Sequence, residues 1–156
     1  MMQSKGLIYL FLILVSCSYG ATTRVVGLCS TAPSYTKIQL AIDAASPGDT
    51  ISICDGNYSE SITIGKNNLT VQSSSSNRNN VIIQNISGNT LAISGVDGLV
   101  IKDISLKQTK SNNAVVFSKN FTSKNITFSN IDIDSNTTGV IGDAIRFDGN
   151  ATNIAI

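Results

Sequence analysis

The sequence lacks two residue types that many functional sites use: it contains no histidine and no tryptophan. Without histidine, a Ser-His-Asp or Cys-His nucleophilic arrangement of the usual kind cannot form. Charged residues are also sparse, at 13% of the chain with a formal net charge of +1, and the 11 basic residues are scattered singly from Lys5 to Arg146. Because no basic stripe is present to bind phosphates, we expect no nucleic-acid partner.

The residue types that dominate instead are Ser, Thr, Asn, Ile and Gly. This composition is typical of a protein rich in β-strands and turns. A length of 156 residues allows one domain.

The N-terminal residues have the pattern of a secretory signal peptide. Lys5 precedes the short apolar run Gly6–Val15, and small residues stand at both ends of Ser18–Gly20, where a signal peptidase reads the chain. We predict that residues 1–20 are this signal and that the mature chain has no transmembrane span, which would need about 20 apolar residues. An alternative is that Leu14–Cys17 resembles a bacterial lipobox, with Cys17 as a lipid-anchored N-terminus. Either interpretation exports the chain.

Two cysteines, Cys29 and Cys54, remain after the predicted signal. In an oxidising compartment such a pair forms a disulfide by default. Closing this loop of about 25 residues would stabilise the fold by about 3 kcal/mol. The alternative is two buried free thiols. A metal site is not expected, because two isolated cysteines without histidine cannot complete a tetrahedral shell.

Seven Asn-x-Ser/Thr sequons follow the signal. In a eukaryotic secretory pathway such asparagines carry glycans and lie on the surface. A chain this rich in Asn, Ser and Thr also produces sequons by chance, and Asn suits tight corners. The predicted glycosylation sites are Asn57, Asn68, Asn85, Asn120, Asn125, Asn136 and Asn150.

The apolar residues repeat with a period of 24 to 30 residues. Leu99–Leu106 and Ile126–Ile133 share one pattern 27 residues apart, and Ile154–Ile156 and Leu69–Val71 continue it on either side. A second series keeps the same approximate period; it consists of Ile62–Ile64, Leu91–Ile93, Val115–Phe117 and Ile145–Phe147. Two series with one period indicate a structural repeat.

The alternation within each piece is that of a short strand, with its outer residues on one side. A two-residue break at Lys102–Asp103, and again at Ser129–Asn130, shifts the phase by one. In a flat strand this shift would expose the second apolar pair, whereas a corner keeps both pairs inside. The pattern therefore predicts a β-solenoid of about four rungs, spaced about 4.8 Å apart, with Ser73–Asn80 as a loop.

The N-terminal end of this coil is expected to carry a helical cap. The pattern predicts a helix over Lys37–Ala45, with its apolar face over the first rung and with Thr36 and Gln39 as a capping box. A bridge between Cys29 and Cys54 would fasten this cap. At the other end the sequence stops in mid-rung, so we expect a continuation of the chain or a partner to cover it.

Three stretches resemble the opening of pectin-lyase-like right-handed parallel β-helix proteins: Ile38–Ile51, the G-x-Y-x-E motif at Gly56–Glu60, and Leu69–Val71. The resemblance implies an all-β, right-handed, single-stranded parallel β-helix with its cap over residues 21–48 and its rungs over 49–156. We interpret Gly56–Glu60 as a turn, with Tyr58 packed on the first rung and Glu60 facing solvent or the cap helix.

The superfamily includes pectate lyases, pectin methylesterases, polygalacturonases and many surface proteins, so polysaccharide is the partner it implies. The chain lacks motifs resembling QDTL, DFIFG and LGRPW of the methylesterases and those of the polygalacturonases. A lyase-like scheme would use clustered Asp residues with Ca²⁺ and an Arg as base. The candidates for it are Asp132 with neighbouring Asp134, Asp143 and Arg146; we favour their being solvated surface charges, and assign no catalytic residue and no cofactor.

Two functional hypotheses follow. The first is a secreted, non-catalytic β-helix that serves as a carbohydrate-binding or adhesive surface protein, which the missing catalytic motifs favour. The second is the N-terminal portion of a polysaccharide lyase or carbohydrate esterase whose catalytic residues lie beyond Ile156, and only this alternative would use Ca²⁺.

Overall fold

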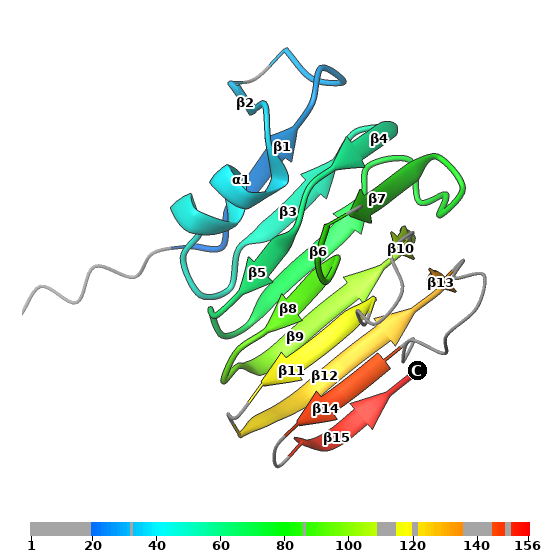
Figure 1. Cartoon of the computed structure of the whole chain (residues 1–156). Coiled ribbons are helices and arrows are strands. Elements are labelled where there is room, and N and C mark those ends of the chain that lie inside the picture. Colours follow the sequence, from blue (N-terminus) through cyan, green and yellow to red (C-terminus); the bar gives the residue numbers. More distant parts are fainter. Residues whose placement is uncertain are drawn as a thin grey trace, which may run out of the picture.

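The computed structural model describes residues 20–31, 33–85, 87–108, 115–119, 122–135, 145–148 and 151–156. In this part of the chain, short strands follow one another around a common axis, with one helix, α1 (Ile38–Ala44), at the N-terminal end of the coil (Figure 1). Every strand pair is parallel. The predicted parallel β-helix of about four rungs is confirmed.

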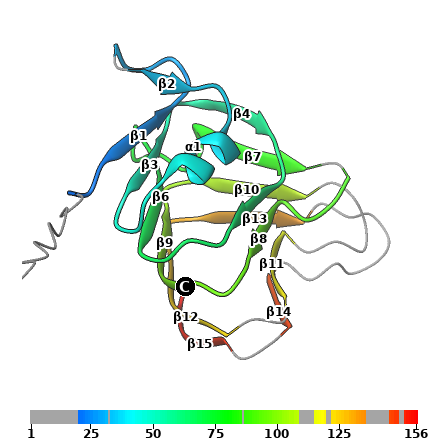
Figure 2. The same cartoon turned by 90° about the vertical axis from the view of Figure 1, so that its left-hand side faces the viewer.

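The strands form three sheets, which lie on separate sides of the coil (Figure 2). Sheet A has the order β15 (Ala151–Ala155), β12 (Ser123–Ser129), β9 (Asp97–Lys102), β6 (Leu69–Ser73), β3 (Thr50–Ile53), β1 (Thr23–Val26) and β2 (Ser34–Tyr35). Sheet B has the order β13 (Asp132–Ser135), β10 (Ser105–Gln108), β7 (Val81–Asn85) and β4 (Gly56–Ser59). Sheet C has the order β14 (Ile145–Asp148), β11 (Val116–Lys119), β8 (Leu91–Ile93) and β5 (Ile62–Ile64). Each rung gives one strand to each sheet in turn.

The apolar repeat forms the interior of the coil. In sheet A, Leu69 pairs with Leu99, Leu99 with Ile126, and Ile126 with Ile154, as the period predicts. The first three of these side chains are at most 1% exposed. Several strands, such as β5, β7 and β8, contribute two buried aliphatic side chains each. Because each such side chain contributes about 1.5–3 kcal/mol, the core depends on every rung keeping its register.

The predicted corner between sheets A and B is confirmed. Asp103 and Asn130 follow β9 and β12 and adopt left-handed conformations, with φ of 57° and 50°. Asn130 Nδ2 donates to Asp103 Oδ1 at 2.7 Å, so the two corners are joined along the axis. Asn and Asp tolerate this conformation better than other residues with a side chain. The left-handed residue turns the chain and returns Ile104 to the interior, where it is fully buried.

A second column of left-handed residues lies where the chain enters sheet A. Gly48 (φ 96°) and Asn68 (55°) stand just before β3 and β6, and Gly98 (74°), Asn125 (55°) and Asn153 (54°) lie within the first three residues of β9, β12 and β15. Asn153 Nδ2 donates to Asn125 Oδ1 at 3.1 Å, and Asn125 Nδ2 donates to Asp97 Oδ1 at 2.7 Å. These bonds link the rungs along the outside of the coil.

Two local predictions were wrong. The stretch Gly56–Ser59 is strand β4 of sheet B rather than a turn, and it pairs with β7. In sheet C, Val116 and not Val115 pairs with Leu91 and with Ile145. Both Val115 and Val116 are fully buried, so the apolar pattern could not distinguish the two registers.

The predicted cap helix is present, but Thr36 and Gln39 do not form its capping box. Lys37 is the N-cap residue and its side chain makes no capping bond. The carboxylate of Glu60 accepts hydrogen bonds from the backbone N–H groups of Ile38 and Gln39, at 3.1 and 3.3 Å. A carboxylate suits this position because helix N–H groups at the first turn lack partners within the helix.

The side chain of Gln39 instead covers the edge of sheet C. Its Oε1 accepts from the backbone N–H of Thr63 at 2.7 Å, and its Nε2 donates to the Thr63 carbonyl at 3.2 Å. Lys66 Nζ donates to the carbonyls of Asp43 and Ala45 at the other end of α1. Gln39 thus satisfies backbone groups that an open first rung would expose, and Lys66 satisfies carbonyls at the end of the helix.

The loop that the sequence predicts after β6 is also present, between β6 and β7. The carbonyl of Arg78 in this loop accepts a hydrogen bond from the hydroxyl of Ser105 at 2.8 Å. The loop therefore covers the start of β10, where Ser105 is only 2% exposed.

In the described part of the chain, no helix has the length and hydropathy needed to cross a bilayer. Residues 1–19 of the predicted signal, with Cys17, lie outside the described residues. The signal and the lipid anchor therefore stay predictions.

The column at the entrance to sheet A generates a test at Gly98. A Cβ there would lie 2.3 Å from Asn68 Oδ1, at a φ of 74°. We expect Gly98→Ala to lower the free energy of unfolding by about 2 kcal/mol, because backbone strain adds to displacement of Asn68. Gly65→Ala is the control, since its Cβ would meet nothing closer than Ser94 O at 3.7 Å. Equal urea midpoints for the two variants would contradict the role of the column.

Candidate functional site

The described residues proposed for a lyase-like site lie on two sheets, with both aspartates on β13 and Arg146 on β14. Asp132 is exposed on β13 of sheet B, whereas Arg146 is exposed on β14 of sheet C. Asp134 lies 3.8 Å from Lys107 Nζ, an exposed pair of the kind that contributes little to stability. Asp143 lies outside the described residues. Among the described residues no three Asp, Glu or Cys side chains gather as metal ligands.

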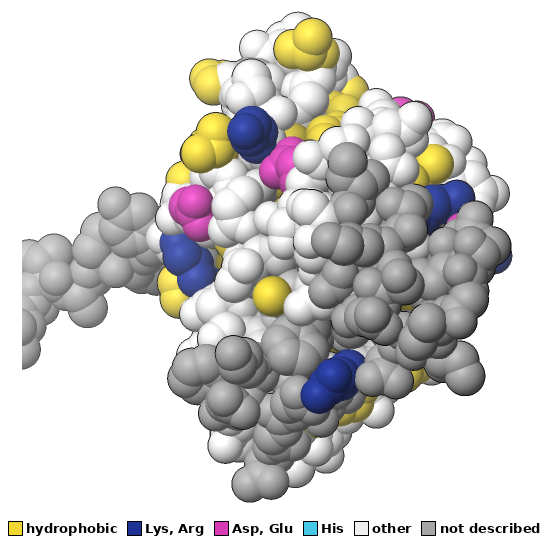
Figure 3. Space-filling model, viewed as in Figure 1, with side chains coloured by type: hydrophobic (Ala, Val, Ile, Leu, Met, Phe, Trp, Pro, Cys, Tyr) yellow, Lys and Arg dark blue, Asp and Glu magenta, His cyan; other side chains and the backbone are white. Residues whose placement is uncertain are grey.

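Charges on the visible surface are scattered. On the face drawn in Figure 3, the Lys and Arg side chains lie apart from one another or beside an acidic residue. The only glutamate, Glu60, is committed to the N-terminus of α1, which confirms that it faces the cap helix.

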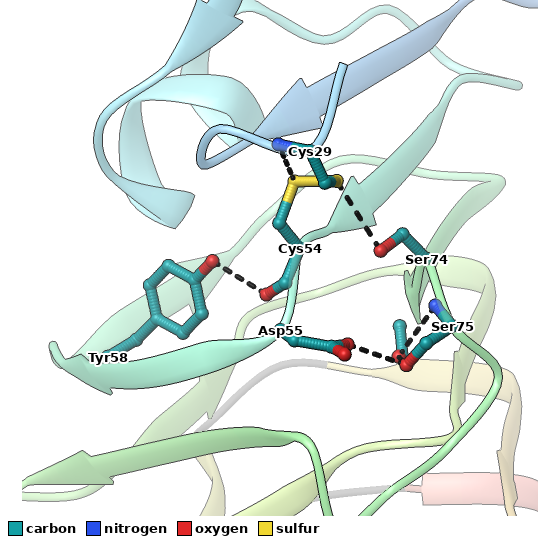
Figure 4. Close-up of a disulfide and its surroundings, with 7 residues drawn as sticks. Cys29, Cys54, Asp55, Tyr58, Ser74 and Ser75 are labelled. Carbon is teal, nitrogen blue, oxygen red and sulfur yellow. Dashed lines mark hydrogen bonds between the residues drawn. A yellow bond between two sulfur atoms is a disulfide. The ribbon is translucent and has the colours of Figure 1, made fainter.

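The predicted disulfide joins Cys29 to Cys54, with a Cα–Cα distance of 5.6 Å (Figure 4). It ties the segment after β1 to the end of β3. The Tyr58 hydroxyl donates to the Cys54 carbonyl at 2.8 Å, so the tyrosine packs at the first rung as predicted. Burial raises the pKa of Tyr58, and the carboxylates of Glu60 and Asp55 raise it further. Tyr58 is therefore a neutral hydrogen-bond donor at physiological pH.

Asp55 fastens the loop after β6. Its Oδ1 accepts from the Ser75 hydroxyl at 2.6 Å, and its Oδ2 accepts from Asn80 Nδ2 at 2.9 Å (Figure 4 shows the first of these). A pocket of about 460 Å³ lies beside the disulfide and is lined by Leu28, Cys29, Cys54, Asp55, Ser74 and Ser75. Asp55 is the one charged residue among those that line this pocket.

A buried ion pair holds the other side of the cap. The Asp49 side chain is 2% exposed, and its carboxylate accepts from Arg24 Nε at 3.0 Å and from the backbone N–H groups of Thr22 and Ser46 at 2.8 and 2.9 Å. Burial acts to raise the pKa of Asp49, but the bonds from Ser46, Thr22 and Arg24 outweigh it, so the pKa lies below its ordinary value. Asp49 is therefore ionised and fixes the position of Arg24.

Arg24 also reaches β2. Its Nη1 donates to the Tyr35 hydroxyl at 3.1 Å. Burial alone would lower the pKa of Arg24, but the hydrogen bonds and charges of Tyr35 and Asp49 raise it above its usual value. The guanidinium is thus a permanent cation held in one orientation by two partners.

A second pocket, of about 450 Å³, opens beside this guanidinium. It lies where β1 and β2 meet at the edge of sheet A, and it is lined by Thr22, Thr23, Arg24, Pro33, Ser34 and Tyr35. We call these six residues the cap pocket. Sequence reasoning missed it because the residues come from two segments that no motif connects.

Comparison with known proteins identifies the fold. No family model matches the chain, and no curated protein matches it either. Among solved structures, the chain is similar to the pectin methylesterase PemA from Erwinia chrysanthemi, with 18% sequence identity and a TM-score of 0.50 over 74% of this chain. The chain has the pectin-lyase-like right-handed parallel β-helix fold. It spans 45% of the length of that enzyme.

The outer face of sheet B in this β-helix carries a row of polar side chains in register. Ser59 pairs with Gln84, Gln84 with Lys107, and Lys107 with Asp134. Gln84 Nε2 donates to the Ser59 hydroxyl at 3.4 Å. We call these four residues the sheet B row. They present hydroxyl, amide, ammonium and carboxylate groups at the spacing of parallel strands, about 4.8 Å.

The predicted glycosylation sites differ in their surroundings. Asn57 is exposed on the edge strand β4, and Asn68 is exposed at a corner. Asn85 is 9% exposed and its Nδ2 donates to the Asn89 carbonyl at 2.9 Å. Asn125 uses its Nδ2 within the column at the entrance to sheet A. Three further predicted sites lie outside the described residues: Asn120, Asn136 and Asn150.

The buried Asp49 generates a pH test. Because its folded pKa lies below the ordinary value of 3.8, the ionised group stabilises the fold above that value, and this contribution is lost as the pH falls through the folded pKa. We expect Asp49→Asn to cost about 2–3 kcal/mol at pH 7, and the difference from the wild type to shrink as the pH falls below 3.8. The free energy of unfolding in urea, measured for the wild type and for Asp49→Asn from pH 2.5 to 7, gives this difference. Asp132→Asn is the charge-matched control. A difference that stayed the same at every pH would contradict the account.

The disulfide generates a second test. Cys29→Ser combined with Cys54→Ser removes a crosslink across a sequence separation of 25 residues, which we expect to cost about 3 kcal/mol. The melting temperature with and without reductant measures this cost. The double variant serves as the control, because its melting temperature should not respond to reductant. A wild-type protein equally insensitive to reductant would show that the bridge does not hold the cap.

Proposed function

We propose that this chain is an exported β-helix protein that binds polysaccharide along the outside of its coil and has no catalytic site of its own. The observation that carries the proposal is the sheet B row. Its side chains are partly or fully exposed and in register, so one extended ligand can contact several rungs at once. Polysaccharides repeat their hydroxyl groups along the chain. Several hydrogen bonds to one such ligand, each weak alone, together give measurable binding.

The export half of the proposal rests on the N-terminal signal pattern and on the disulfide. Disulfides persist in oxidising compartments and are rare in the cytosol. We propose Asn57 as the sequon best placed to carry a glycan, because it is exposed on an edge strand. Asn85 is disfavoured, since a glycan would replace a hydrogen bond of a buried amide.

The absence of catalysis is supported by the way the described acidic residues are used. Asp49, Asp55 and Glu60 are bonded within the protein as structural anchors. Asp132 and Arg146 lie on different sheets, which disfavours their acting as the carboxylate and base of one site. Without a cluster of carboxylates among the described residues, a Ca²⁺-dependent reaction has no support there.

A second candidate function is favoured by the structural neighbour. PemA is a pectin methylesterase, and the chain spans 45% of its length. Under this alternative the chain would form the N-terminal rungs of a polysaccharide-active enzyme, with the catalytic residues contributed beyond Ile156 and Ca²⁺ used only if the reaction is a lyase. The chain on its own would still be inactive.

Binding to a panel of polysaccharides tests the proposal. The panel contains pectin, de-esterified pectin, cellulose, xylan and mannan, and retention is measured by co-sedimentation or affinity electrophoresis. We expect retention by at least one of them, and a reduction of about tenfold in affinity for Gln84→Ala combined with Lys107→Ala, because two hydrogen-bonding groups are lost. Thr70→Ala on the outer face of sheet A is the control. Retention by none of the panel would contradict the proposed function.

An activity assay separates the two candidates. Release of methanol or of unsaturated products from pectin, with and without Ca²⁺, should be blank for this chain. Turnover that Asp132→Ala or Arg146→Ala abolishes would establish a catalytic site here and overturn the non-catalytic proposal.

A further inference from the structure

We infer that the cap pocket binds a carboxylated sugar residue, with the sugar carboxylate against the guanidinium of Arg24. This inference rests on the proposed binding of polysaccharide and names the chemical class and the position of one contact. The pocket lies at the N-terminal end of sheet A, apart from the sheet B row.

The size of the cap pocket fits such a ligand. Its volume of about 450 Å³ lies within the range of about 300–1,000 Å³ that small-molecule pockets occupy. Three of its lining residues carry hydroxyl groups on short side chains: Thr22, Thr23 and Ser34. The ring of Tyr35 and the side chain of Pro33 add apolar surface that a sugar ring can cover. A sugar presents this combination of hydroxyl groups and apolar C–H surface.

Arg24 has donors left for a ligand. A guanidinium carries five N–H groups, and within the described residues Arg24 uses Nε for Asp49 and one Nη1 hydrogen for Tyr35. Its side chain keeps 22% of its surface exposed. The remaining donors on Nη1 and Nη2 are those that bind a carboxylate in a bidentate arrangement.

The pairing with Asp49 does not remove this capacity. Asp49 also accepts from the backbone N–H groups of Thr22 and Ser46, so its charge is shared among three donors. Asp49 and the Tyr35 hydroxyl hold the guanidinium in place before any ligand arrives. A group that is already oriented loses less conformational entropy on binding, which favours the complex.

The charge of the pocket favours a carboxylate over a phosphate. Arg24 is the one Lys or Arg among the residues that line it, and Asp49 beneath it is negative. A phosphate monoester carries nearly two negative charges and needs more cations than this pocket offers, whereas a carboxylate needs only two parallel N–H donors of one guanidinium. A neutral sugar hydroxyl presents one acceptor oxygen to these donors, whereas a carboxylate presents two in parallel.

Titration with trigalacturonate tests the inference. Its fully methyl-esterified form removes the charge and keeps the sugar rings, and maltotriose is a neutral control of the same length. We expect trigalacturonate to bind at least about tenfold more tightly than the ester. Arg24→Gln should abolish this preference, and Tyr35→Phe and Thr23→Val should each weaken binding by about three- to tenfold. Arg78→Gln is the matched control and should bind as the wild type does.

The variants keep the test decisive if Arg24→Gln fails to fold. Tyr35→Phe and Thr23→Val each remove one hydroxyl at a partly or fully exposed position, and the ester comparison needs no variant. Equal binding of acid and ester, unchanged binding in Tyr35→Phe and Thr23→Val, or no binding of trigalacturonate by the wild type would overturn the inference. If the polysaccharide panel still retains the wild type in that case, the proposed function stands and only the cap pocket is wrong.

Discussion

The left-handed residues at the entrance to sheet A are the constraint on which the rest of the coil depends. A strand alternates its side chains with a period of two, so an apolar repeat can face one interior across three sheets only if the chain changes phase at each corner. At the entrance to sheet A one residue with positive φ makes this change; in the described rungs it stands just before β3 and β6 and within the first three residues of β9, β12 and β15, and these strands pair in register. Asparagine or glycine occupies each of these positions.

The N-terminal end is held by contacts of another kind. A disulfide, a buried ion pair and a carboxylate on the helix N-terminus each join segments that are more than 20 residues apart in the sequence. Together they fasten α1, β1 and β2 over the first rung (Figure 1). The same contacts orient Arg24 and shape the cap pocket, so the structural fastening and the inferred binding site share residues. Function at this end therefore follows from how the coil is closed.

Much of the fold could be predicted from the sequence because its information is local and periodic. The spacing of Leu99 and Ile126 and the break at Lys102–Asp103 gave the pairing and the corner directly. The register at Val115 and Val116 could not be predicted, because two adjacent apolar residues do not show which of them pairs with the neighbouring strands.

The capping of α1 by Glu60 was missed for a different reason: a capping box is a local pattern, and the group that caps the helix lies 22 residues from Ile38. The cap pocket required the same non-local knowledge, since Arg24 and Tyr35 meet only after β1 and β2 pair. Asp132 and Arg146 looked close in the sequence, but the coil sends them to different sheets.

The central claim is that the left-handed column fixes the register of every rung, and solution NMR tests it most directly. Cross-strand nuclear Overhauser contacts between backbone protons report which residues face one another in adjacent strands. The account predicts contacts that follow the pairing of Thr70 with Val100 and of Val100 with Thr127, on a single set of resonances. Contacts displaced by one residue between any two of these strands, or several sets of resonances for one strand, would contradict it.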